Sequence, residues 1–97
     1  MPTWKQSLMD WVDYDGSDAG ESEPCEVRID ENAIVVSYED DRGVVNYRGE
    51  GKGPGHFALE SPERNGKATL HMFEGSKILE GFWIEEGWKG FWRITLA

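Results

Sequence analysis

The chain has 97 residues, with 10 Lys and Arg against 19 Asp and Glu, which gives a formal net charge of −9. This length predicts a single domain over residues 1–97, because a chain of this size buries about 65% of its surface on folding. The negative charge argues against nucleic acid or an anionic membrane as a partner, since both need clustered cations. No apolar stretch is long enough to span a membrane, no signal peptide is recognised, and a lone cysteine excludes an internal disulfide framework. We therefore expect a cytoplasmic protein.

The N-terminal segment, residues 1–12, is predicted to be a short helix. Its large apolar residues recur at helical spacing and would lie on one face: Trp4, Leu8, Trp11 and Val12. A strand through Met9–Tyr14 is the competing interpretation, because short apolar patterns fit both periods.

Residues 13–24 form an acidic, turn-rich stretch that holds few apolar side chains. Such a segment cannot bury enough apolar surface to order itself, so we expect a mobile loop. The alternative is that its carboxylates form a contact segment for a basic partner.

Seven later segments are rich in β-branched or aromatic residues and are separated by turn residues, a pattern that predicts strands. They are Cys25–Asp30, Ala33–Glu39, Val44–Gly49, His56–Glu60, Ala68–Phe73, Lys77–Glu85 and Trp88–Leu96. Short turns are placed at Glu31-Asn32, Asp41-Arg42, Gly75-Ser76 and Glu86-Gly87, and they permit only antiparallel hairpins. Because open edges invite aggregation, the predicted fold class is all-β: an antiparallel up-and-down meander of seven or eight strands, closed or nearly closed into a small barrel, with the short N-terminal helix.

The turns also set the register, which assigns each side chain to the inside or the outside of the sheet. The inner face of the first strands holds Cys25, Val27, Ile29, Ile34, Val36, Tyr38, Val45 and Tyr47. The inner face of the last strands holds Leu70, Met72, Leu79, Gly81, Trp83, Gly90, Trp92 and Ile94. Glycines beside tryptophans indicate a tightly curved interior that makes room for large rings. Cys25 is expected to be a buried structural thiol, and Trp88, beside a turn, is expected to be exposed.

On the outer face, the same registers bring His71, Glu80 and Arg93 into one row across three strands. If the preceding hairpin pairs opposite charges, His56 joins this row. Aromatic side chains flank it, and the candidate ligand-binding residues are His56, His71, Glu80, Phe82, Phe91 and Arg93. The N-terminal helix is expected to cover the apolar part of this face.

The row has more than one interpretation. An arginine beside a carboxylate and a histidine can hold an anionic ligand between aromatic walls. A Glu–His pair can also perform general acid–base chemistry, which would make the protein a small enzyme. The plain alternative is a surface salt bridge between Glu80 and Arg93 beside solvated histidines. Two histidines and a carboxylate are metal-ligand types, but no spacing supports a metal site, and we expect no catalytic residue and no cofactor.

The C-terminal half of the chain repeats a glycine–aromatic pattern, in Gly81-Phe82-Trp83 and again in Gly90-Phe91-Trp92. This alternation resembles the strands of calycin-type meander barrels, the avidin and lipocalin group, and those of small bacterial β-proteins. The resemblance implies an up-and-down barrel whose mouth binds a small, largely apolar ligand. The chain is shorter than those proteins and lacks the disulfides usual in secreted lipocalins, and none of their ligand-contacting residues can be carried over.

We therefore expect non-catalytic binding of a small, partly apolar ligand at a barrel mouth, with an anionic polar end as one option. The alternative function is an acidic protein-interaction module, of inhibitor or immunity type, that binds a basic partner through residues 13–26 and Glu85-Glu86. Salt separates the two, because it weakens contacts between charges but not the burial of an apolar ligand.

Overall fold

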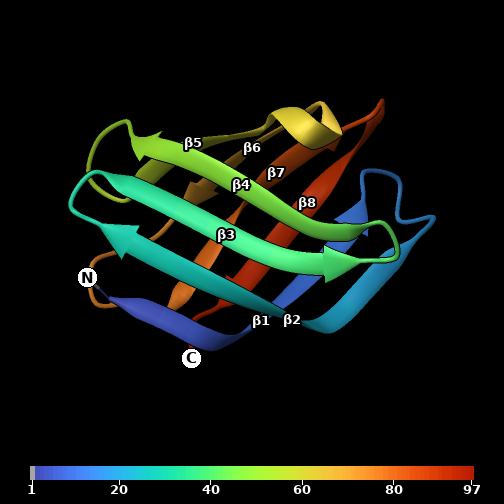
Figure 1. The fold of residues 1–97 in the computed structure, drawn as a ribbon. Helices are drawn as coiled ribbons and strands as arrows, with labels where there is room; N and C mark the ends of the chain where they lie inside the picture. Colours follow the sequence, from blue (N-terminus) through green and yellow to red (C-terminus); the bar gives the residue numbers. More distant parts are fainter. Residues whose placement is uncertain (1) are drawn as a thin grey trace.

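The computed structural model describes residues 2–97, which form eight strands and one short 3₁₀ helix. In chain order they are β1 (Thr3–Asp13), β2 (Ala19–Asp30), β3 (Ala33–Asp40), β4 (Gly43–Gly51), β5 (His56–Ser61), η1 (Pro62–Arg64), β6 (Gly66–His71), β7 (Ile78–Glu85) and β8 (Trp88–Thr95). Each strand pairs antiparallel with the next, and β8 pairs with β1, which closes the barrel (Figure 1). The predicted all-β closed meander is confirmed. Within residues 2–97, no helix has the length and apolar character that a bilayer crossing requires.

The predicted division into an inner and an outer face is also confirmed. The valines Val27, Val36 and Val45 are completely buried, as are Leu79 and Ile94 at the other side of the barrel. Charged residues next to the buried positions, such as Arg28, Glu80 and Arg93, are exposed, since side chains alternate across a strand. This alternation gives a barrel filled by side chains over most of its length.

The hairpins form as the turn residues predict, with one shift. Glu86 and Gly87 both have positive φ, 52° and 88°, which is the geometry of a two-residue type I′ turn. Between β6 and β7 the turn lies one residue earlier than the predicted Gly75-Ser76. The backbone N–H of Ser76 donates to the carbonyl of Phe73, which places Glu74 and Gly75 at the centre of the turn. The pairing of His71 with Glu80 across this hairpin still has the predicted register.

The predicted N-terminal helix is wrong. Residues 3–13 form β1, and Met1 lies outside the described residues. β1 alternates as a strand, with Ser7, Met9 and Asp13 buried on its inner side. Two of these three buried residues are polar, so the sequence of β1 does not show the alternation of apolar and polar residues that marks a strand. β1 pairs with both β2 and β8, so it satisfies two sheet edges that a helix would leave open.

The predicted acidic loop over residues 13–24 is also mostly wrong. Only residues 14–18 form a turn, and β2 begins at Ala19. β2 pairs with β1 along most of its length, from Ala19 to Arg28, whereas its pairing with β3 begins only at Glu26. Glu21 and Glu23 are exposed, so their charge does not prevent a strand that has a backbone partner on one side.

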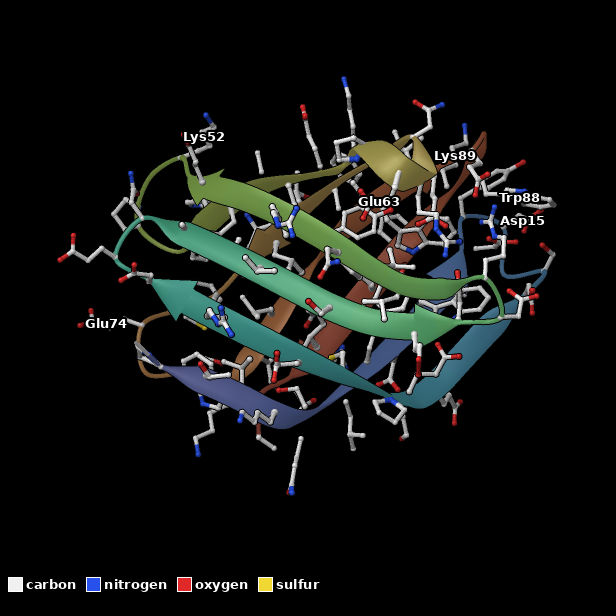
Figure 2. All side chains as sticks on the ribbon, in the orientation of Figure 1. Asp15, Lys52, Glu63, Glu74, Trp88 and Lys89 are labelled. Carbon is white, nitrogen blue, oxygen red and sulfur yellow. The ribbon has the colours of Figure 1, made fainter. Side chains whose placement is uncertain are left out.

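The connections between strands gather at two ends of the barrel. The β1–β2, β3–β4, β5–β6 and β7–β8 connections lie at one end, which we call the mouth. Figure 2 shows Asp15 and Trp88 at this end, with Lys52 and Glu74 at the opposite end. Toward the opposite end, Phe57 and Leu96 are buried members of the core.

Candidate functional site

The polar row predicted for the outer face is assembled with the predicted registers. His56 pairs with His71, His71 with Glu80, and Glu80 with Arg93. The Nδ1 atoms of the two histidines are 2.7 Å apart, so one ring donates a hydrogen bond and the other accepts it. Arg93 Nε lies 3.3 Å from Glu80 Oε1, and both of these side chains are more than half exposed.

The row stands on the outer wall of the barrel and away from its mouth. The flanking rings of Phe82 and Phe91 are 43% and 57% exposed, since no helix covers them. Phe82 also borders a shallow hollow on the outer face of β3 to β7. An ion pair this exposed contributes little to stability, and ligand binding by the row stays a prediction.

A cavity of about 500 Å³ opens at the mouth. Seven carboxylate residues, six aromatic residues and one methionine line it: Asp13, Asp18, Glu23, Glu39, Asp40, Asp41, Glu85, Trp11, Tyr38, Tyr47, Trp83, Trp88, Trp92 and Met9. Within residues 2–97, no lysine, arginine or histidine belongs to this lining. The cavity has the size of a small-molecule site and the aromatic walls that such sites share, and its polar lining is made up of carboxylates.

The tryptophan walls are held in place through their indole N–H groups. Trp11 Nε1 donates a 2.6 Å hydrogen bond to Glu23, and Trp92 Nε1 donates a 3.0 Å bond to the backbone carbonyl of Thr69. The ring of Trp83 stands edge-on to that of Trp11, with 6.1 Å between the ring centres. Rings fixed in this way form a preformed surface, so a ligand would find little to reorder.

Two glycines on the inner face make room for large rings that line the cavity. A Cβ atom on Gly66 would lie 2.3 Å from the hydroxyl of Tyr47, and one on Gly90 would lie 2.8 Å from the ring of Trp83. The sequence-based expectation that glycines accommodate large inner rings is confirmed at Gly90, whereas a Cβ atom on Gly81 would meet the backbone of Thr69 and no ring.

Glu85 occupies the inner face of β7 at the base of the cavity. Its Oε1 atom accepts a 2.6 Å hydrogen bond from the hydroxyl of Tyr47, and the hydroxyl of Tyr38 lies 3.4 Å away. Burial, and then the hydrogen bond to Glu85, raise the pKa of Tyr47 well above its usual value. Both tyrosines therefore stay protonated and present donors to the carboxylate.

Asp13, at the end of β1, is only 7% exposed and lines the same cavity. Its Oδ2 atom accepts a 3.2 Å hydrogen bond from the hydroxyl of Ser17. The ion pairs found among residues 2–97 include neither Asp13 nor Glu85. The cavity thus holds two inward carboxylates that accept hydrogen bonds from neutral hydroxyl groups.

An arginine fastens the rim of the mouth. Both terminal nitrogens of Arg64, in η1, bond the two carboxylate oxygens of Asp40 at 2.8 and 2.9 Å. Burial raises the pKa of Asp40, but the hydrogen bonds from Arg64 and from the backbone N–H of Arg42 outweigh it and hold the pKa below its usual value. This bidentate pair ties the β5–β6 connection to the end of β3.

Other chemistry-bearing groups gather no site of their own. Within the part of the chain described, no group of three or more His, Cys, Asp and Glu side chains is arranged to hold a metal ion. Cys25 is 5% exposed on the inner face of β2, and burial raises the pKa of its thiol to about 12. It is the buried structural thiol that the register predicts.

Comparison of the chain with protein-family models, with curated proteins and with solved structures finds no match in any of the three. The cavity lining therefore has to be interpreted from its own chemistry. Sequence reasoning placed Tyr38, Tyr47, Trp83 and Trp92 on the inner face, but it did not gather them with Asp13 and Glu85 at one end.

Proposed function

We propose that the barrel is a non-catalytic binding protein that holds a small, partly apolar ligand in its mouth cavity. The observation that carries the proposal is an aromatic-walled cavity of about 500 Å³ at one end of an otherwise filled barrel. The binding residues proposed here are the cavity walls, led by Trp83, Trp92 and Trp11, instead of the outer row.

Burial of the lining residues changes from the base of the mouth cavity to its rim. Met9 and Trp92 are buried below the cavity, at 4% and 5% exposure, whereas Trp88 at the rim is 67% exposed. An exposed tryptophan at the edge of a concave aromatic surface is a common anchor for a bound molecule. This gradient from a buried base to an open rim supports the entry of a ligand from solvent.

The test is a fluorescence titration with the neutral apolar dye N-phenyl-1-naphthylamine. We expect saturable enhancement that Trp88→Ala weakens and Phe91→Ala leaves unchanged. Both residues are exposed aromatics of β8, but only Trp88 lines the mouth. If Phe91→Ala weakened binding and Trp88→Ala did not, the binding surface would lie on the outer wall. If the unmodified protein did not bind the dye saturably, the proposal would be contradicted.

A second candidate is an acidic protein-interaction module, of inhibitor or immunity type. The observation that favours it is that Asp15, Asp18 and Glu86 gather at the same end of the barrel as the cavity. A basic partner held by this rim would associate faster at low salt, because opposite charges steer encounter. A partner whose association rate does not change with salt would argue against this candidate.

The fold also supports a relation to calycin-type barrels as a proposal. The closed up-and-down meander and the glycine–aromatic alternation of β7 and β8 are the features shared with that group. A lone, buried and unpaired Cys25 fits a reducing compartment, so we propose a cytoplasmic location.

A further inference from the structure

We propose that the ligand of the mouth carries an organic cation, an alkylammonium group attached to an apolar body. This inference rests on the proposed function and names the chemical class of its ligand. It replaces the anionic ligand that the outer row of histidines and Arg93 suggested from the sequence.

The charges that line the cavity all have the same sign. Seven of the lining residues are carboxylates, and no cationic residue among residues 2–97 belongs to the lining. An anionic ligand would be repelled by this lining, whereas a cation would be attracted along the whole path from solvent. The net charge of −9 adds a long-range field of the same sign.

The two inward carboxylates, Asp13 and Glu85, lack a counter-charge within residues 2–97. Asp13 is more than nine-tenths buried and Glu85 is half-buried, yet neither forms an ion pair with another described residue. Removing a carboxylate from water costs free energy unless a counter-charge or hydrogen bonds compensate it. A bound ammonium group would supply that counter-charge.

The protein's own cations near the mouth already have partners. Arg64 lies close enough to Glu85 to interact with it electrostatically, but both of its terminal nitrogens bond Asp40, which among the described residues is the one lining carboxylate paired in this way. Arg42 pairs with Glu86 outside the cavity, and the Lys89 ammonium lies 4.9 Å from the centre of the Tyr14 ring. The place for a cation inside the cavity is therefore open to a ligand.

The aromatic wall of the cavity also suits a cation. Ammonium groups bind over the faces of tryptophan and tyrosine rings, which are electron-rich, and they bind there more strongly when water is excluded. Trp83, Trp92 and Tyr47 surround the base of the cavity where Glu85 lies. Apolar substituents on the cation would contact the same rings, so one surface serves both parts of the ligand.

The experiment uses three probes that share a phenylethyl or benzyl body and differ in charge: phenethylammonium, 2-phenylethanol and phenylacetate. Each is titrated into the full-length protein by calorimetry at neutral pH, and the tryptophan indole N–H signals are followed by NMR. We expect phenethylammonium to bind roughly tenfold more tightly than the alcohol, with phenylacetate the weakest.

Glu85→Gln keeps an acceptor for the Tyr47 hydroxyl and should remove most of this preference for the cation without abolishing binding of the alcohol. Asp13→Asn tests the second carboxylate in the same way.

The matched control is Glu74→Gln, which makes the same charge change at the end of the barrel opposite the mouth (Figure 2). It should leave the order of the three probes unchanged. Equal affinity for all three probes, or tightest binding of phenylacetate, would overturn the cation proposal and leave the proposed function intact. Failure of all three probes to move the indole signals of the mouth would count against both.

An alkylammonium group can reach the mouth as a free amine or as a lysine side chain of a protein. A fourth probe, N-acetyl-lysine-N′-methylamide, presents that side chain as a protein would. Tighter binding of phenethylammonium assigns the site to a free amine with an apolar body, as proposed. Tighter binding of the lysine derivative would overturn the apolar part of the proposal and point to a basic partner protein.

Discussion

The hydroxyl of Tyr47 donates a 2.6 Å hydrogen bond to Oε1 of Glu85, which joins β4 to β7 across the inside of the barrel. Tyr47 is 1% exposed, so this bond forms away from water at the level where the filled core gives way to the mouth cavity. It holds the carboxylate in position at the base of the cavity. The arrangement links the stability of the barrel to the geometry of its proposed binding site.

Tyr47→Phe should lower the free energy of unfolding by about 2 kcal/mol. The substitution removes a donor to a charged acceptor and leaves the carboxylate of Glu85 with a weaker set of partners. Urea unfolding measures the change. Tyr14→Phe is the matched control, since Tyr14 is 64% exposed and should show almost no effect. Equal stability of the two variants would mean that the Tyr47–Glu85 bond does not form.

Gly66→Ala should destabilise the barrel by about 1–3 kcal/mol, because the new methyl group would lie 2.3 Å from the hydroxyl of a fully buried Tyr47. The hydroxyl is the nearest atom. The same substitution should therefore cost less in a Tyr47→Phe background, which a double-mutant cycle measures. Strict additivity of the two changes would contradict this packing relationship.

Arg64→Met should destabilise the protein more than Arg42→Met. Arg64 is 6% exposed and makes a bidentate bond to Asp40, whereas the side chain of Arg42 is 54% exposed in its pair with Glu86. Because the pKa of Asp40 is lowered in the folded state, its pairing stabilises the fold above the ordinary value of 3.8, and this contribution is lost as the pH falls. Denaturation curves of both variants at neutral and acid pH provide the measurement. A larger loss in Arg42→Met would contradict the burial of the Arg64 pair.

The thiol of Cys25 should react with a disulfide reagent at about pH 8 only as fast as the barrel opens, because the thiolate is scarce in the folded state. Burial raises its pKa from 9.0 to about 12. Between these values the unfolded chain releases a proton that the folded chain keeps, so stability falls as the pH rises. In Cys25→Ala this part of the alkaline loss should disappear. Rapid labelling of the native protein would show that the thiol is accessible.

Much of the fold follows from local patterns in the sequence. From Cys25 onward, apolar residues such as Val27, Leu79 and Ile94 alternate with polar or charged residues, which fixes the side that faces inward, and short turns fix the pairing. The row of His71, Glu80 and Arg93 follows from the same rules. These features depend only on neighbouring strands, so one sequence suffices to predict them.

The first 24 residues mislead for physical reasons. Ser7 and Asp13 are polar residues on the inner face, so β1 lacks the alternation of an ordinary strand. Its conformation is decided by pairing with β8, which lies at the other end of the sequence. A binding mouth is predicted, but its lining is not, since Asp13 and Glu85 come to line one cavity only when β1 closes the barrel.

The measurement that tests the central claim most directly is a two-dimensional amide and indole NMR map of the labelled protein, titrated with a mixed library of small metabolites. We predict shifts at the indole signals of Trp11, Trp83 and Trp92, caused by a ligand in the mouth. Shifts confined to His71 and Arg93 on the outer wall, with unchanged indole signals, would contradict the account.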